Sequence, residues 1–201
     1  MNDVSRETSA RLERFARLLV EENERQNLVA KSTLDDLWRR HIDDAAQLVS
    51  YGDPTKTWLD IGSGAGLPGI VIALLIDGPV ILVEPRRLRA DFLRRVVDDL
   101  ALADRVSIIQ TKVERVDRPA VDVITARAVA SIDHLFSIAS HLSRDGTIWV
   151  LPKGKSVESE LDEARKTWQG EFRLEKSRTD PDARILIATR VRRRHRARGV
   201  A

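Results

Sequence analysis

The chain has 201 residues, of which 42% are hydrophobic and 32% charged, and its formal net charge at neutral pH is +3. This composition is typical of a folded globular protein, and the length suits one well-buried domain with an appendage. Because the chain has no cysteine, disulfides, thiolate metal sites and cysteine nucleophiles are excluded, and a reducing compartment, the cytoplasm, is expected.

The first 50 residues are predicted to form a helical cap. The N-terminal sequence is polar and no run of about 18 apolar residues occurs, so we expect neither export nor a membrane span. Helical spacing of apolar residues predicts a helix over 5–28, with Ser5 as N-cap, and a second helical segment over 34–49. The turn-rich YGDPTK at 51–56 predicts a boundary between a cap (1–50) and a larger domain (51–191).

After this boundary, short apolar strands alternate with helical segments. Five strands of near-continuous β-formers are predicted at 57–61, 79–84, 105–110, 121–126 and 147–152. Crossover helices are predicted at 70–76, 88–102, 132–142 and 157–168. Strands at 172–177 and 184–191 flank the turn-like RTDPDA and predict an antiparallel hairpin at the sheet edge. The pattern indicates a Rossmann-like α/β fold with a mostly parallel sheet.

The stretch WLDIGSGAGLPGI at 58–70 joins the first strand to the first helix of this array. In an open parallel sheet, ligands bind beside this turn, where glycines leave backbone amides uncovered next to a helix N-terminus. Gly64, Gly66 and Gly69 fit GxGxxG, the dinucleotide fingerprint. Asp60 followed by Gly62, Gly64 and Gly66 fits DxGxGxG, which resembles motif I of S-adenosylmethionine-dependent methyltransferases.

The position of the glycines relative to the strand favours the methyltransferase pattern. Asp60 lies at the strand end, where a carboxylate suits a ligand with sulfonium and ammonium groups better than a diphosphate. Glu84 ends the second strand, 18 residues after Gly66, and an acid there can accept both ribose hydroxyls of either cofactor. We therefore predict S-adenosylmethionine as the cofactor, with a nicotinamide-dependent oxidoreductase as the alternative.

The loops after the third and fourth strands offer further contacts. In TKVERV, Val113 is placed to cover an adenine ring and Glu114 to accept its exocyclic amine, unless Glu114 is a solvated loop acid. Arg127 follows the fourth strand, where it can hold the methionine carboxylate, a nucleic-acid phosphate or guanine O6. The alternative for Arg127 is a surface ion pair with Asp122 or Asp133.

The segment after the fourth strand also limits the chemistry. No (N/D)PP(Y/F) motif follows that strand, and the lack of cysteine excludes covalent attack on pyrimidine C6. The remaining acceptor is one that is already nucleophilic. Guanine N7 carries an in-plane lone pair, so its methylation needs alignment and exclusion of water but no general base.

Polar residues of the cap and of the loop after the fifth strand are candidates for the substrate site. Arg40 and His41 are predicted to line the cleft beneath the cap, and Lys153 to flank the same pocket as a phosphate contact. A metal site formed by His41, Asp43 and Asp44 is not predicted, because their spacing spreads the side chains around a helix.

Several longer motifs point to one family. They are QNLVAKS, RRHIDDA, LDIGSGAGLPGI, the KVE of TKVERV, ITARAVA and LPKG. Over most of its length the chain resembles the RsmG, or GidB, family of bacterial 16S ribosomal RNA guanine-N7 methyltransferases. The resemblance implies a Rossmann-like class I S-adenosylmethionine-dependent methyltransferase fold with an N-terminal helical extension. It also implies methyl transfer to a guanine N7 in 16S rRNA of the small ribosomal subunit.

The resemblance also implies cofactor contacts at individual positions. Those carried over are Gly62, Leu67, Val113, Glu114 and Arg127, to which the strand geometry adds Gly64, Gly66 and Glu84. Arg127 is also the candidate catalytic residue. The sequence departs from the family pattern at Val29, where threonine is usual, and at Glu84, where aspartate is frequent. A monomer is expected, and an RNA-binding module with a vestigial cofactor pocket is a third interpretation.

The C-terminus is strongly basic. Seven arginines and no acid lie from Arg184 onward, which leaves 27 basic and 31 acidic residues in 1–183. A basic tail over 192–201 is therefore predicted to contact RNA phosphates, with a solvated chain end as the alternative.

Overall fold

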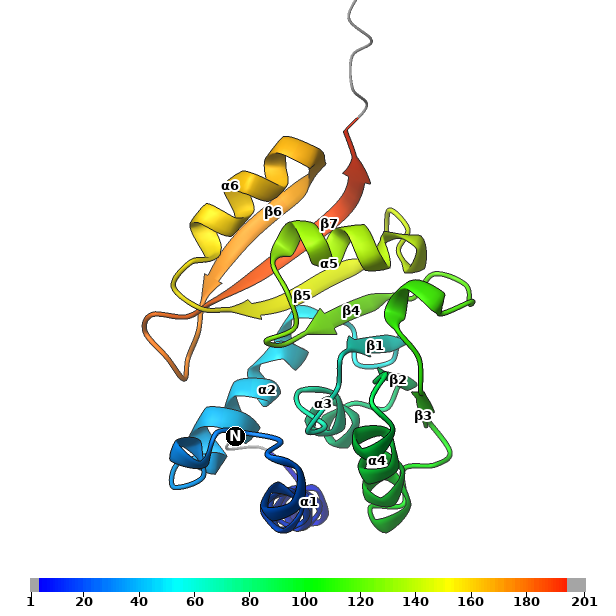
Figure 1. The fold of residues 1–201 in the computed structure, drawn as a ribbon, viewed down its shortest axis with the longest axis vertical. Helices are drawn as coiled ribbons and strands as arrows, with labels where there is room; N and C mark the ends of the chain where they lie inside the picture. The colour runs from blue at the N-terminus through cyan, green and yellow to red at the C-terminus, as the bar shows by residue number, and fades with distance from the viewer. Residues whose placement is uncertain (1–3, 195–201) are drawn as a thin grey trace, which may run out of the picture.

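Seven strands form a single sheet in the computed structural model, which describes residues 4–194. The strand order is β3-β2-β1-β4-β5-β7-β6 (Figure 1). The strands are β1 (Trp58–Ile61), β2 (Val80–Val83), β3 (Val106–Ile109), β4 (Val123–Ala126), β5 (Ile148–Lys153), β6 (Trp168–Lys176) and β7 (Arg184–Arg193). β1 to β5 pair in parallel and β7 pairs antiparallel with β5 and β6. This confirms the predicted sheet and its edge hairpin.

Helices cover both faces of the sheet (Figure 1). Successive side chains of a strand point to opposite faces, so Trp58 packs with the cap-side helices and Leu59 with the helices of the other face. The cap-side helices are α1 (Arg6–Gln26), α3 (Gly69–Leu75) and α4 (Arg87–Asp99). The other face carries α5 (Ile132–Ala139), α6 (Val157–Thr167) and the 3-10 turn η4 (Val113–Arg115).

The cap consists of α1 and a series of short helical turns. The hydroxyl of Ser5 accepts the N–H of Thr8 at the start of α1, as expected of an N-cap, and Phe15 on the buried face is fully enclosed. The second predicted segment is not one regular helix. It comprises η1 (Lys31–Thr33), a π-helical turn η2 (Trp38–Asp43), α2 (Asp44–Ala46) and a 3-10 turn η3 (Gln47–Tyr51). Single π turns are rare and frequently occur at functional sites.

The sheet places the functional region between β1 and β4. Strand order reverses there, and in such sheets the crevice beyond the carboxyl ends of the strands binds ligands. Residues of the cap border this crevice, since Leu28 and Val29 line a cavity together with the glycines that follow β1. At the other end of the chain, Arg192 and Arg193 of the predicted tail belong to β7, and residues 195–201 of that tail lie outside the described residues.

Candidate active site

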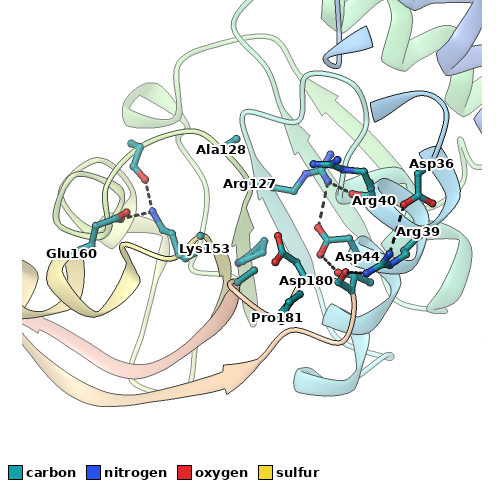
Figure 2. Close-up of a pocket in the computed structure, with 15 residues that line it drawn as sticks. Asp36, Arg39, Arg40, Asp44, Arg127, Ala128, Lys153, Glu160, Asp180 and Pro181 are labelled. Carbon is teal, nitrogen blue, oxygen red and sulfur yellow. Dashed lines mark hydrogen bonds and ion pairs between the residues drawn. The ribbon is translucent and has the colours of Figure 1, made fainter. Parts of the chain in front are cut away.

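Two cavities lie near the carboxyl ends of the parallel strands. The glycine cavity encloses about 340 Å³ between the β1–α3 loop, the end of β2, the cap and residues 127–129. The cap cavity encloses about 540 Å³ between the cap, the ends of β4 and β5, and the β6–β7 loop (Figure 2). Arg127 and Ala128 line both cavities and therefore form the boundary between them.

The glycines of the β1–α3 loop serve different purposes. Gly62, Gly64 and Gly66 have φ angles of 67°, 48° and 80°, which favour glycine. A Cβ at Gly64 would meet no atom within 3.4 Å and would extend into the glycine cavity. A Cβ at Gly66 would lie 2.8 Å from Ile70 and 3.2 Å from Phe15. Gly66 is thus required for packing beneath α1, whereas Gly64 leaves space for a ligand.

Glu84 holds the glycine loop in place. Its Oε2 accepts the N–H of Gly64 at 2.9 Å and its Oε1 accepts the N–H of Arg86 at 2.8 Å. The residue is buried and lines the glycine cavity. Because each carboxylate oxygen has more than one acceptor position, Glu84 can order the loop and still accept a hydroxyl from a ligand.

Asp60 does not face a ligand, contrary to the expectation from its place at the strand end. Its side chain lines neither cavity and its Oδ2 accepts the N–H of Gly69 at 3.2 Å, where α3 begins. Alternation along β1 places Asp60 on the same face as Trp58, beneath α3. Burial raises the pKa of Asp60 to about 7. Asp60 therefore connects strand to helix through Oδ2, while its buried Oδ1 has no hydrogen-bond partner among the described residues.

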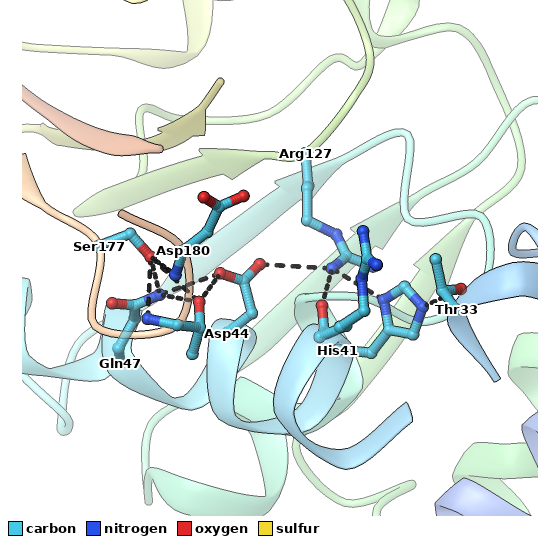
Figure 3. Close-up of polar contacts among 9 residues, drawn as sticks. Thr33, His41, Asp44, Gln47, Arg127, Ser177 and Asp180 are labelled. Carbon is cyan, nitrogen blue, oxygen red and sulfur yellow. Dashed lines mark hydrogen bonds and ion pairs between the residues drawn. The ribbon is translucent and has the colours of Figure 1, made fainter. Parts of the chain in front are cut away.

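Arg127 is held at the boundary by the cap. Its Nη1 lies 3.2 Å from Nδ1 of His41 and 3.4 Å from Oδ2 of Asp44, with which it forms an ion pair (Figure 3). Burial lowers the pKa of Arg127 and the charge of Asp44 opposes this effect, so the guanidinium stays protonated. Within residues 4–194, the hydrogen bonds of this side chain all use Nη1. Its other N–H groups are available to a ligand.

His41 is fixed as a neutral imidazole by its two partners. Thr33 donates its hydroxyl to the carbonyl of Ala30 at 2.6 Å, so it accepts a hydrogen bond from Nε2–H of His41 at 2.8 Å. Nδ1 is then unprotonated and accepts from Arg127. Burial, reinforced by the charge of Arg127, lowers the pKa of His41 to about 4. Neither ring nitrogen is left to act on a substrate.

Asp44 connects Arg127 to the β6–β7 loop. Its Oδ1 accepts the hydroxyl of Thr179 at 2.7 Å and the amide of Gln47 at 3.0 Å. Gln47 in turn accepts the backbone N–H of Arg178 at 2.9 Å. The cap, the end of β4 and the edge hairpin are therefore joined around one carboxylate (Figure 3).

The profile of the family GidB, rRNA small subunit methyltransferase G, matches residues 8–180. The chain belongs to this family. The ribosomal RNA small subunit methyltransferase G of Rhizorhabdus wittichii is 46% identical over 95% of this chain and 89% of its own. The enzyme of the same name from Zymomonas mobilis is 44% identical over 94% of this chain and 88% of its own.

Solved structures support the fold expected of this family. The O-methyltransferase from Bacillus cereus in complex with SAH superposes with a TM-score of 0.61 at 16% identity, over 90% of this chain and 91% of that one. A SAM-dependent methyltransferase from Aquifex aeolicus superposes with a TM-score of 0.59 at 14% identity, over 79% of this chain and 95% of that one. The fold is thus that of class I S-adenosylmethionine-dependent methyltransferases.

The structure brings most of the predicted site residues of this family member together. The glycine cavity is lined by Gly62, Gly64, Leu67, Glu84 and Arg127. Three predicted cofactor residues do not line it: Gly66, Val113 and Glu114. Val113 is buried in the core of the other sheet face and Glu114 is exposed on η4. Their contacts with adenine stay a prediction from the sequence.

The predicted substrate residues separate in a similar way. Arg40 and Lys153 line the cap cavity. His41 does not line it but forms a hydrogen bond with Arg127, which does. Lys153 already has partners, because its ammonium donates to Glu160 at 2.9 Å and to the carbonyl of Ala130. The sequence predicted Lys153 as a phosphate contact, but in the structure its ammonium is already paired.

Sequence reasoning missed the pairing of Asp44 with Arg127 and the presence of Asp180 in the cap cavity. The RRHIDDA motif contains Asp44, but its sequence pattern suggests this residue only as a metal ligand and not as a partner of Arg127. No motif in the sequence indicated that Asp180 lies in this cavity, because its turn meets the cap only through long-range packing.

Within the described part of the chain, no group of three or more His, Asp or Glu side chains could hold a metal ion. No helix among residues 4–194 has the length and apolar character to cross a bilayer.

Proposed function

We propose that this protein transfers a methyl group from S-adenosylmethionine to N7 of a guanine in 16S rRNA of the small ribosomal subunit. The observation that carries the proposal is the pair of cavities that meet at Arg127 and Ala128. One is built on the glycine loop typical of methyltransferases, and the other offers room for a base. The names of the relatives support small-subunit rRNA as the substrate.

The glycine cavity fits the cofactor by its own chemistry. Gly64 leaves open space beside the loop, and Glu84 retains acceptor capacity for ribose hydroxyls. Leu67 and Val129 add apolar walls. S-adenosylmethionine supplies an electrophilic methyl group on a sulfonium. The free N–H groups of Arg127 suit the carboxylate of its methionine part or a phosphate of the RNA.

The polar groups at the boundary favour an acceptor that needs no deprotonation. Both nitrogens of His41 are engaged, and both oxygens of Asp44 accept hydrogen bonds. His41 therefore has no ring nitrogen left to serve as a general base, and the carboxylate of Asp44 is held in an ion pair with Arg127. A guanine N7 lone pair meets this condition, since the protein then has only to align it with the methyl group and exclude water.

Transfer of a tritiated methyl group to small-subunit particles tests this function. Digestion of the product to nucleosides is expected to yield 7-methylguanosine, and free rRNA assayed in parallel distinguishes the two forms of substrate. Another modified nucleoside would contradict the proposal. Calorimetry with S-adenosylhomocysteine and NADH tests the oxidoreductase alternative, which tight binding of NADH alone would favour. The proposal includes a monomer acting in the cytoplasm, which sedimentation and fractionation can check.

A further inference from the structure

Four carboxylates line the cap cavity, and three of them have basic partners. The four are Asp36, Asp44, Glu160 and Asp180. The pairs are Asp36–Arg39 at 4.0 Å, Asp44–Arg127 at 3.4 Å and Glu160–Lys153 at 2.9 Å. Within residues 4–194, Asp180 forms no ion pair. It is therefore the carboxylate of this cavity whose charge no basic side chain of the described residues offsets.

The Asp180 side chain is held in position by its own loop. Its Oδ1 accepts the backbone N–H of Asp182 at 2.9 Å, and its carbonyl accepts the N–H of Ala183 at 3.2 Å. The loop is tied to the cap by the hydrogen bond from Thr179 to Asp44. Figure 2 shows the carboxylate of Asp180 directed into the cavity. No hydrogen bond within the described residues uses its Oδ2.

The chemistry of guanine sets two requirements for this cavity. N7 has to face the boundary at Arg127 and Ala128, beyond which the glycine cavity lies. N1–H and the exocyclic 2-amino group lie on the opposite edge of the base and then point away from that boundary. A carboxylate can accept both N–H groups in parallel, whereas adenine presents an acceptor at N1 and would be repelled.

We infer that Asp180 is a specificity residue that selects guanine by accepting hydrogen bonds from N1–H and the 2-amino group. The inference rests on the proposed function, because it assumes that the cap cavity receives the base to be methylated. The other acids of the cavity are poorly suited to this role. Glu160 and Asp44 are neutralised by their partners, and Asp36 lies beside Arg39.

The variant Asp180→Asn tests the inference, since an amide replaces one acceptor with a donor and keeps the shape. The substrate is small-subunit particles reconstituted with either guanine or inosine at the methylated position, because inosine lacks the 2-amino group. For guanine, kcat/KM is expected to fall about 10- to 100-fold, the range for loss of a bidentate base contact. Affinity for S-adenosylhomocysteine is expected to stay unchanged. The preference of the wild-type protein for guanine over inosine is expected to shrink or vanish in the variant.

Asp182→Asn is the matched control, because this acid of the same loop is exposed like Asp180 but does not line the cavity. Its activity is expected to stay within about twofold of the wild type. An Asp180→Asn variant with wild-type kcat/KM, or with an unchanged guanine-to-inosine ratio, would overturn the inference. Failure of the proposed function would instead appear in the wild-type protein itself, as a product other than 7-methylguanosine.

Discussion

Arg127 and Asp44 form an ion pair at 3.4 Å that joins the end of β4 to the cap. Each side chain is less than one fifth exposed, so the pair is mostly shielded from water. Because Asp44 also accepts a hydrogen bond from the β6–β7 loop, three distant parts of the sequence depend on it. The wall between the two cavities is therefore set by the docking of the cap.

Replacing Asp44 with Asn should weaken this docking. The amide keeps an acceptor for Thr179 but leaves the guanidinium of Arg127 without its counter-charge. We expect the free energy of unfolding to fall by about 1–3 kcal/mol, less than for a fully buried pair. Urea denaturation measures this change, and methyl transfer should fall with it. Asp43→Asn, at an adjacent acid, is the control. Equal losses for both variants would mean that the ion pair has no special role.

The stability of the protein should depend on protonation of His41. Its folded-state pKa of about 4 lies below the ordinary value of 6.5, so the unfolded chain binds the proton more readily. The stabilisation from neutral His41 is complete above pH 6.5 and is lost as the pH falls toward 4. The full loss is roughly 3 kcal/mol.

Comparison of the wild type with His41→Asn isolates this effect, because the Asn carbonyl can still accept a hydrogen bond from Arg127 and does not titrate. Asp60 changes the pH dependence of stability in the opposite direction, but it does so in both proteins, so its contribution cancels in the comparison. Its raised pKa of about 7 gives stability at low pH that is lost as the pH rises toward 7. Unfolding in urea at pH 7, 5.5 and 4.5 should show the wild type losing stability relative to the variant. Parallel curves for the two proteins would exclude a buried neutral His41.

Substitutions at two glycines should separate ligand binding from packing. Gly64→Asp introduces an anion into the glycine cavity at a φ of 48°, which aspartate tolerates better than most residues. We expect loss of S-adenosylhomocysteine binding by calorimetry, with only about 1 kcal/mol of destabilisation. Gly66→Ala should instead lower stability by about 2–4 kcal/mol, because its Cβ meets Ile70 and Phe15. Wild-type cofactor affinity in Gly64→Asp would place the cofactor elsewhere.

Removal of the C-terminal residues should reduce the salt dependence of rRNA binding. Arg192 pairs with Asp145, and Arg194 donates to the carbonyls of Arg165 and Trp168, so truncation is best made after Arg194. Loss of Arg196 and Arg198 should lower the slope of log K against log salt by about 1–2.

Filter binding at several salt concentrations measures the slope. The full-length chain with both arginines changed to Gln is the matched control, since it keeps the length and removes the charges. Cofactor affinity should not change in either protein. An unaltered slope would assign the tail a role other than phosphate contact.

Periodic patterns along the chain determined the parts of this protein that depend on local sequence. Runs of β-formers alternating with helical segments predicted each of the seven strands, and the glycines after Asp60 located the glycine cavity. These features depend on backbone preferences and on neighbours close in sequence. The sequence therefore settled the fold, the family and one wall of the site.

Tertiary packing decided which side chains share a cavity. Asp60 was close to the expected ligand in sequence, but strand alternation turned it beneath α3. Lys153 was expected to be free, yet the start of α6 brings Glu160 to it. The pairing of Asp44 with Arg127 spans more than 80 residues, and only the docked cap creates it. Such contacts depend on how whole elements pack, and local sequence carries no record of that geometry.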